Sequence, residues 1–172
     1  MRRLTPSLRP TSPELDPVRL RQATREDQPT IHRLVHQANI NPLDLVWQRF
    51  LLAVDEAGEA IGCGQVKPHR DGSRELSSIV VIESWRRRGV ARALIERLMA
   101  EAGPPLWLTC RSGLVPLYVR FEFRLLGPDE PQPAYFRRVR RLAAAFGMLA
   151  GRGESLAVMV WEGGKAPGHS AL

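Results

Sequence analysis

One segment of the chain places an apolar strand, arginines and a glycine in the order expected of a phosphate-binding turn. Residues 79–82 read as the end of a buried apolar strand, residues 83–89 contain an arginine-rich turn, and a helical pattern begins at Val90. The first turn of a helix has backbone N–H groups without intrahelical partners, and together with the helix dipole these favour a bound anion. Gly89 has no Cβ, so a ligand can approach the backbone closely there.

Two common phosphate loops do not fit this turn. It contains one glycine and no lysine, whereas a P-loop ends in Gly-Lys-Ser/Thr and a dinucleotide fingerprint has three spaced glycines. What remains is Arg86-x-x-Gly89-x-Ala91. This pattern resembles the Q/R-x-x-G-x-G/A signature that binds the acetyl-CoA pyrophosphate in the GCN5-related N-acetyltransferase (GNAT) family.

A second segment, residues 117–123, resembles the C-terminal pattern of the same family, in which a tyrosine at the end of a short helix precedes a Gly-Phe pair. The resemblance implies that Tyr118 lies beside the thioester sulfur as a general acid. A phenol with a pKa near ~10 is protonated at neutral pH and can donate to a leaving thiolate. The alternative is an ordinary half-buried tyrosine that caps a helix.

The hydrophobic periodicity predicts one α/β domain over residues 18–162, between a disordered extension at residues 1–17 and a disordered tail at residues 163–172. The expected strands are residues 18–21, 50–55, 60–68, 74–82, 106–110, 123–126 and 156–161. The expected helices are residues 25–38, 41–47, 90–102, 112–120 and 133–150. This order resembles the GNAT fold, which implies a mixed, mostly antiparallel sheet of six to seven strands, flanked by helices and splayed between the fourth and fifth strands.

Composition agrees with a protein of one domain. The chain has 172 residues, of which 44% are hydrophobic, so it can bury one substantial core. No apolar run reaches the ~18 residues of a membrane span, and the basic start lacks the apolar block of a signal peptide. We therefore expect a cytoplasmic protein without a membrane partner. Cys63 and Cys110 lie in apolar, strand-like runs and are expected to be buried, reduced thiols.

The histidines do not predict a metal site. His32 and His36 share a helix face at a spacing of four residues, but no cysteine, aspartate or third histidine near them completes a ligand set. Surface or partly packed histidines are the expected outcome.

The resemblance implies acetyl-CoA as the acetyl donor and no metal. It places the pantetheine arm along the backbone of the fourth strand and the pyrophosphate on the following turn. It also implies a cofactor contact at the arginine after the fifth strand. The implied cofactor-binding residues are Ile79, Val80, Val81, Arg86, Arg87, Arg88, Gly89, Val90, Ala91, Arg92 and Arg111. The implied reaction is direct attack by a primary amine, from a protein or a small molecule, on the thioester in a ternary complex.

Several positions depart from the family pattern. Glu83 stands where a proline is common, Glu122 replaces the glycine before the phenylalanine, and Arg111 replaces a cofactor-contacting asparagine. Leu106 stands where the N-terminal acetyltransferases of the bacterial ribosomal type have a glutamate base, which argues against transferring their specificity to this chain. We therefore expect that the backbone turns at residues 83 and 122 can differ in conformation from those of the family.

No general base follows directly from the sequence. Glu75 on the fourth strand is the best candidate, acting through a water, and Glu83 is a second choice. The alternative for Glu75 is an exposed strand residue paired with Arg74 or Arg70. Leu43, Trp47 and Tyr135 are candidates for an apolar acceptor pocket or, equally, for the core.

Two other functions remain open at this stage. A catalytically silent acyl-CoA-binding regulatory module would tolerate the departures at Leu106, Arg111 and Glu122. A basic nucleic-acid-binding protein would use the arginines between Arg137 and Arg141, which we expect to form a solvated helix face, and the net charge of +7 is compatible with it. An acetyltransferase with an unidentified amine acceptor is the favoured interpretation, and the oligomeric state is not predicted.

Overall fold

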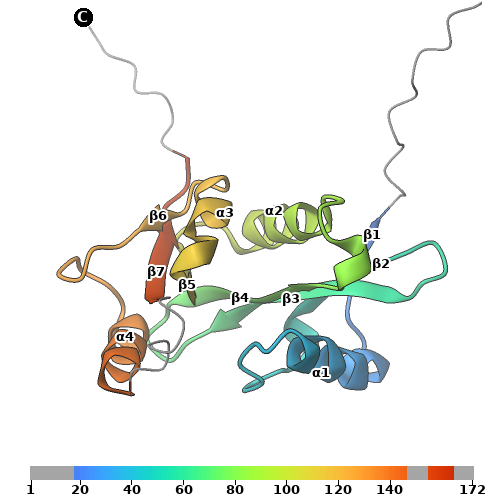
Figure 1. The fold of residues 1–172 in the computed structure, drawn as a ribbon, viewed down its shortest axis with the longest axis horizontal. Coiled ribbons are helices and arrows are strands. Elements are labelled where there is room, and N and C mark those ends of the chain that lie inside the picture. The colour runs from blue at the N-terminus through green and yellow to red at the C-terminus, as the bar shows by residue number, and fades with distance from the viewer. Residues whose placement is uncertain (1–17, 147–154, 165–172) are drawn as a thin grey trace, which may run out of the picture.

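A seven-stranded sheet forms the centre of the computed structural model, which describes residues 18–146 and 155–164 (Figure 1). The strands, in chain order, are β1 Arg19–Gln22, β2 Phe50–Val54, β3 Ala60–Pro68, β4 Arg74–Val81, β5 Leu106–Arg111, β6 Arg124–Leu125 and β7 Leu156–Trp161. They lie side by side in the order β1-β2-β3-β4-β5-β7-β6. All neighbours are antiparallel except β4 and β5, which are parallel. The predicted mixed, mostly antiparallel sheet is confirmed.

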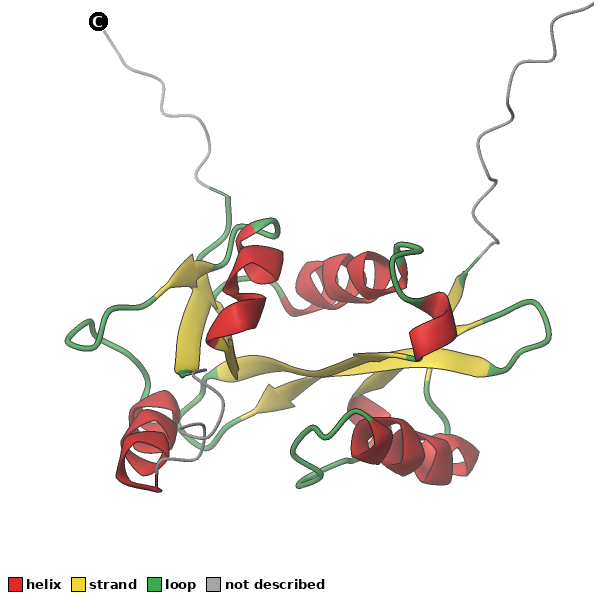
Figure 2. Ribbon diagram, viewed as in Figure 1, coloured by secondary structure: helices red, strands yellow, loops and turns green. Residues whose placement is uncertain are grey.

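Within the described residues, four α-helices cover the two faces of this sheet. They are α1 Gln28–Gln37, α2 Val90–Ala102, α3 Val115–Val119 and α4 Ala134–Phe146. In Figures 1 and 2, α2 and α3 lie above the sheet, and α1 and α4 lie below it.

Each face has its own hydrophobic core. On the α2 face, buried residues of β5 and β7 pack with Leu94, Ile95 and Leu98 of the helix. On the α1 face, Ile31, Leu34 and Val35 pack against β2 and β3. The apolar stripe of each helix thus follows the helical period that the sequence shows.

Two glycines of β3 allow the layers to approach closely. A Cβ at Gly62 would lie 2.7 Å from the carbonyl oxygen of Val80, and one at Gly64 would lie 2.6 Å from Ile79 Cδ1 and 2.9 Å from Leu98 Cδ1. A side chain at Gly62 would meet the backbone and displace the neighbouring strand, whereas one at Gly64 would displace the side-chain ends of Ile79 and Leu98. These glycines place β4 and α2 close to β3, and so fix the strand that leads into the arginine-rich turn.

The parallel pair β4 and β5 separates almost at once. Its ladder contains a single pair, Glu75 with Trp107, whereas β5 pairs with β7 over six residues. β4 also has an irregular register against β3 between Cys63 and Gln65, where Ser78 adopts a φ of 56°. Such a bulge bends a strand and increases its local twist. The predicted splay between the fourth and fifth strands is confirmed.

One predicted element is wrong. Residues 41–47 do not form a helix, and only a 3₁₀ turn at Trp47–Arg49 follows this loop. The Asn41 side chain instead accepts a hydrogen bond from the Leu43 N–H at 3.0 Å, and Asp44 has a left-handed φ of 60°. An asparagine that bonds the backbone two residues later favours a turn over a helix.

The other helices agree with prediction, with differences at their ends. The helix expected at residues 25–38 begins as a 3₁₀ turn at Arg25–Asp27, where the Asp27 carboxylate accepts a hydrogen bond from the Thr24 N–H at 2.7 Å. The helix expected at residues 112–120 is likewise a 3₁₀ turn followed by α3. The end of the helix expected at residues 133–150 lies outside the described residues, as do the extension at residues 1–17 and most of the tail.

No helix within residues 18–146 or 155–164 has the length and apolar character needed to cross a bilayer. Both cysteines are buried and unpaired, as predicted. Burial raises the pKa of Cys63 to about 12 and that of Cys110 to about 11.

Candidate active site

The gap between β4 and β5 is the centre of the candidate site. Beyond the Glu75–Trp107 pair the two strands diverge, so β4 has no sheet partner on that side. Backbone N–H and C=O groups without sheet partners bind an extended, amide-bearing ligand well, because it can pair with them as a strand would. The predicted pantetheine-binding residues Ile79, Val80 and Val81 all lie on this stretch of β4.

The arginine-rich turn follows directly from the end of β4. A 3₁₀ turn at Glu83–Trp85 leads to exposed residues 86–89, and Gly89 precedes the first residue of α2. Gly89 has a φ of 81°, and a Cβ there would meet no atom within 4 Å. Glycine is therefore favoured by the left-handed backbone, and the space around it is open to a ligand.

The arginines of this turn have different surroundings. The Arg86 Nε donates to the Val81 carbonyl at 3.3 Å, and the Arg88 guanidinium lies 5.1 Å from the centre of the Trp85 ring. Arg92 forms an exposed ion pair with Glu96 at 2.7 Å, one turn along α2. Exposed pairs of this kind are weak, so Arg92 is available to an anion at little cost. Arg111 lies at the exposed end of β5.

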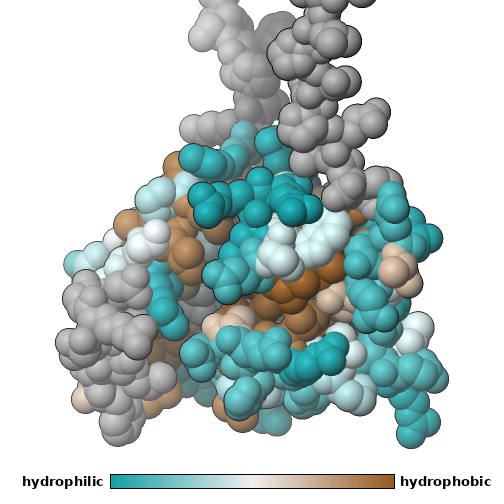
Figure 3. Space-filling view, turned by 45° about the vertical axis from the view of Figure 1, so that its right-hand side comes forward, coloured by the Kyte–Doolittle hydropathy of each residue, from teal (hydrophilic) through white to brown (hydrophobic). Residues whose placement is uncertain are grey.

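A hollow of about 200 Å³ adjoins the end of β4 on the α1 side. Its lining residues are Leu34, Gln37, Ala38, Val80, Val81, Ile82, Glu83 and Arg86. Figure 3 shows hydrophobic surface in a recess between two bands of hydrophilic residues on the right-hand side of the molecule. The hollow therefore lies between α1 and the turn at the end of β4.

Tyr118 is largely buried on the α2 side of the sheet. It belongs to α3, and its ring packs edge-on against Phe123 with the ring centres 6.0 Å apart. Burial, with a smaller contribution from nearby Cys110, raises the pKa of Tyr118 to about 12. The hydroxyl is thus protonated at every physiological pH, as a proton donor to a thiolate must be.

Glu75 lies at the point where β4 and β5 separate. The residue is 4% exposed, and its two oxygens have different partners: Oε2 lies 3.0 Å from His69 Nε2, and Oε1 accepts a hydrogen bond from the Thr109 hydroxyl at 2.9 Å. The alternative pairing with Arg74 does not occur, because that guanidinium donates to carbonyl oxygens at the end of α2. Glu75 is therefore a buried carboxylate, not an exposed strand residue.

Aromatic rings close this cluster on the α4 side. The His69 ring stacks on Tyr135 with the ring centres 3.5 Å apart, and Phe136 contacts both rings. Burial and the neighbouring Glu75 carboxylate raise the pKa of Tyr135 to about 12. Tyr135 thus contacts the Glu75 cluster through His69 and is not among the buried core residues.

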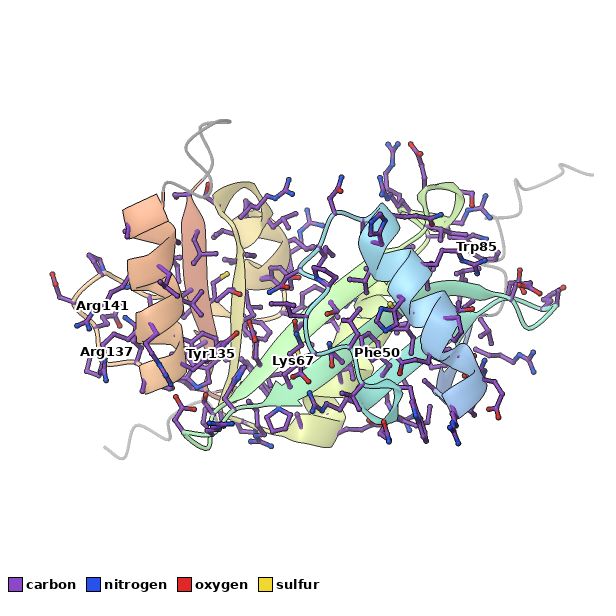
Figure 4. The ribbon with its side chains drawn as sticks, turned by 90° about the horizontal axis from the view of Figure 1, so that it is seen from below. Phe50, Lys67, Trp85, Tyr135, Arg137 and Arg141 are labelled. Carbon is purple, nitrogen blue, oxygen red and sulfur yellow. The ribbon has the colours of Figure 1, made fainter. Side chains whose placement is uncertain are left out.

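Lys67 and Gln65 extend the cluster along β3, and sequence reasoning missed both. Each is buried, and because they are two residues apart on a strand they point to the same face. A signal was present, since polar residues at alternate positions of an apolar strand indicate a polar surface on one side. Figure 4 shows Lys67 on the underside of the sheet, between Tyr135 near α4 and Phe50 near α1.

The arginines of α4 do not belong to this cluster. Arg137 and Arg141 are exposed and point away from the sheet (Figure 4). Arg140 donates to the carbonyl oxygens of Gly127 and Leu126, at 2.7 and 3.1 Å, and so holds the segment before α4. The arginine cluster within residues 137–141 is therefore divided between one structural arginine and a solvated face.

Three further predicted features can now be placed. His32 and His36 are exposed on α1, and within residues 18–146 and 155–164 no group of three or more metal-ligating side chains occurs. Glu122 has a left-handed φ of 64°, so the backbone here adopts a conformation that favours glycine although the residue is a glutamate. Glu83 is exposed beside the hollow described above.

Comparison with known proteins places these features in one family. Residues 14–123, more than half of the chain, match the family described as "Acetyltransferase (GNAT) family". Among curated proteins, no sequence is significantly similar to this chain.

Solved structures share the fold at low sequence identity. N-acetylglutamate synthase from Neisseria gonorrhoeae, complexed with coenzyme A and N-acetyl-glutamate, is 18% identical with a TM-score of 0.65 and covers 83% of this chain, which spans only 35% of that protein. A Mycobacterium tuberculosis protein in complex with CoA and NLQ is 20% identical with a TM-score of 0.60, over 83% of this chain and 98% of its own. Ard1 from Thermoplasma volcanium is 14% identical with a TM-score of 0.58, over 84% and 99%.

Proposed function

The chain belongs to the acetyltransferase (GNAT) family, and from this premise we propose that it transfers the acetyl group of acetyl-CoA to a primary amine. The observation that carries the proposal is the single-pair ladder between β4 and β5, with an arginine-rich turn and a helix N-terminus at the end of β4. These features supply, in sequence order, a groove for an amide-bearing arm and a site for its phosphates. The CoA found in the structures of similar fold supports the same assignment.

The cofactor would lie along β4. The pantetheine amides would pair with the backbone at Ile79, Val80 and Val81, and the pyrophosphate would lie at residues 86–92, beside the free N–H groups at the start of α2. Arginine suits this position because its planar fork binds phosphate oxygens in pairs. Arg111 at the end of β5 is a further candidate contact on the opposite side of the gap.

The chemistry would be a single displacement at the thioester carbonyl. The amine nitrogen attacks the carbonyl carbon, a C–N bond forms, and collapse of the tetrahedral intermediate breaks the C–S bond. Tyr118 gives its proton to the departing thiolate and regains one from solvent, while the extra proton of the attacking amine leaves to a base. The products are the N-acetylated acceptor and free CoA.

We assign the base role to Glu75, acting through a water. Both of its oxygens are already hydrogen-bonded and the residue is buried, so a bridging water would have to connect it to the amine. Its negative charge, fixed by His69 and Thr109 at the apex of the gap, would also stabilise the positive charge that develops on the attacking nitrogen.

The test is release of CoA thiol when the purified protein is mixed with acetyl-CoA and a panel of primary amines. The proposal predicts amine-dependent release with formation of an acetylated product by mass spectrometry. Tyr118→Phe should lower kcat by roughly 10-fold to 100-fold while binding of acetyl-CoA persists, because only proton donation is removed. Tight binding of acetyl-CoA without transfer to any amine would instead identify a silent acyl-CoA-binding module.

A further inference from the structure

The Lys67 ammonium is a buried cation with little to neutralise it. Lys67 is 7% exposed, and its Nζ donates to the Leu43 carbonyl oxygen at 2.9 Å. Within the described part of the chain this is its one hydrogen bond, and no carboxylate oxygen lies within ion-pairing distance of it. An ammonium has three N–H donors, so two are left without a protein partner. Burial lowers the pKa of Lys67, against the opposing effect of the Glu75 and Asp44 charges.

Gln65, two residues earlier on β3, has the complementary vacancy. Its Nε2 donates to the Ser78 hydroxyl at 3.1 Å, whereas its Oε1 is buried without any hydrogen bond. Buried polar atoms in proteins nearly always have partners, so the unsatisfied Oε1 is explained by a donor from outside the chain. Lys67 thus has N–H donors without an acceptor, and the neighbouring Gln65 has an acceptor oxygen without a donor.

Both vacancies lie beside the reaction centre. In the β3–β4 ladder Lys67 is opposite Glu75 and Gln65 is opposite Ser77, so all four side chains belong to the part of the sheet next to the gap. In Figure 4 the Lys67 side chain lies between α4 and α1, on the face opposite α2. An acceptor that reaches the thioester from this face would pass these groups.

The charges at this position match a zwitterion. Glu75 supplies one negative charge at the apex of the gap, and Lys67 supplies one positive charge directly across the ladder. Cross-strand neighbours of this kind have Cβ atoms about 4.5–5.5 Å apart. Opposite charges on neighbouring side chains are complementary to a ligand that carries an amino group and a carboxylate close together, with the carboxylate at Lys67 and the amine toward Glu75 and Gln65.

We propose that Lys67 forms an acceptor-carboxylate subsite, and that the acceptor is a free amino acid or a small amine with a carboxylate close to the amino group. This inference rests on the proposed acetyltransferase function and names its substrate class. The carbonyl oxygen of Leu43 accepts the hydrogen bond from Lys67, so the loop at residues 38–46 contacts the subsite. Leu43 is 69% exposed, so this part of the loop lies at the protein surface. Asp44 on the same loop is paired with Arg49 at 2.7 Å, so it does not compete for the ammonium.

The first experiment compares amino acids with their own amides as acceptors. Each L-amino acid of a panel and its primary amide, for example L-leucine and L-leucinamide, is offered with acetyl-CoA, and thiol release is measured. The inference predicts at least a 10-fold higher kcat/KM for the carboxylate member of the preferred pair. Lys67→Met should remove this preference by raising KM for the amino acid. Arg137→Met removes an exposed cation from α4 and should leave the preference unchanged.

A binding measurement keeps the inference testable if turnover is absent or a variant is unstable. N-acetyl-L-leucine and N-acetyl-L-leucinamide, with the rest of the preferred panel, are titrated into the protein with CoA present and absent, and binding is followed by ligand-observed NMR. Lys67→Gln and Lys67→Arg are measured alongside Lys67→Met. The inference predicts that the free carboxylate binds more tightly, and that only the arginine variant retains part of the difference.

The outcomes separate this inference from the proposed function. The subsite would be overturned if amides or amines without a carboxylate had the same kcat/KM as amino acids, or if the preference for the carboxylate survived Lys67→Met. Either result would leave the acetyltransferase function intact. Lys67-dependent binding of N-acetyl amino acids without any acetyl-CoA binding would retain the subsite and overturn the enzyme. Failure of both members of every pair to bind would show that Lys67 only holds the loop at Leu43.

Discussion

Glu75 Oε2 on β4 lies 3.0 Å from His69 Nε2, on the turn that connects β3 to β4. The same carboxylate accepts the Thr109 hydroxyl from β5, and the histidine ring stacks on Tyr135 of α4. One buried acidic group therefore joins a hairpin, a strand 34 residues later in the chain and the last described helix. These elements meet where the sheet opens, so the cluster that holds the fold together there also forms the floor of the candidate site.

Replacing Glu75 by glutamine should lower kcat by 100-fold or more, because the base and the negative charge near the reacting amine are both lost. Steady-state kinetics with the best amine acceptor would measure it. Thr109→Val is the matched control: it removes one hydrogen bond to the same carboxylate, at a cost of about 1.5–3 kcal/mol in stability because the acceptor is charged, and should leave kcat within a few-fold of the parent. Wild-type kcat in Glu75→Gln would rule out the base assignment.

Both tyrosines of the chain should ionise far above the ordinary pKa of 10. The pKa values of Tyr118 and Tyr135 are each raised to about 12, and the chain has no other tyrosine. A difference-absorbance titration should therefore show phenolate only near pH 12 in the native protein, and near pH 10 in denaturant. A native transition near pH 10 would contradict the burial of both rings.

The same shift predicts how stability depends on alkaline pH. Between pH 10 and about pH 12 the unfolded chain loses the Tyr118 proton and the folded protein keeps it, so the free energy of unfolding falls as pH rises. The loss from Tyr118 should be roughly 2–3 kcal/mol across this window. Denaturant melts of the parent and of Tyr118→Phe would test it, since the variant should show a smaller decline.

Neither cysteine should react with a thiol reagent in the native state. Cys63 and Cys110 are buried, and burial raises both pKa values, so little thiolate is present at pH 8. Addition of a disulfide reagent should modify no thiol quickly in the native protein and two after unfolding. Rapid labelling of either residue would contradict the packing described for β3 or β5.

Gly89→Ala should weaken acetyl-CoA binding as well as stability. The φ of 81° makes a side chain unfavourable by about 1–2 kcal/mol, and a Cβ would intrude where a pyrophosphate approaches. Gly58→Ala provides the matched control, because Gly58 has a φ of 85° with equally open surroundings in the β2–β3 turn. It should lose similar stability and keep full affinity for the cofactor. Equal affinities in both variants would argue against the phosphate turn.

Local patterns were sufficient to predict most of the strands. The runs of sheet character at residues 50–55, 60–68 and 74–82, separated by turn segments, predicted β2, β3 and β4 within one residue of their observed ends. The helix expected at residues 41–47 was wrong because the Asn41 side chain competed with the backbone, an effect that apolar spacing does not register.

The candidate site was only partly readable in the sequence. The residues of the phosphate turn are contiguous, so their spacing could be compared with a known pattern. The contact between Glu75 and Thr109, and the stacking of Tyr135 on His69, join residues that are far apart in the chain, and they depend on which strands become neighbours. Lys67 could be placed on a face of β3 but not recognised as buried, because that needs the loop at Leu43 and the helix α4 in position.

The proposed CoA site at the end of β4 is tested most simply by calorimetric titration of acetyl-CoA into the parent protein, Gly89→Trp and Gly58→Trp. A CoA site there predicts micromolar binding to the parent and to the Gly58 variant, and none to Gly89→Trp, whose indole would fill the open turn before α2. No heat with the parent protein, or equal binding by both tryptophan variants, would contradict a CoA site at the end of β4.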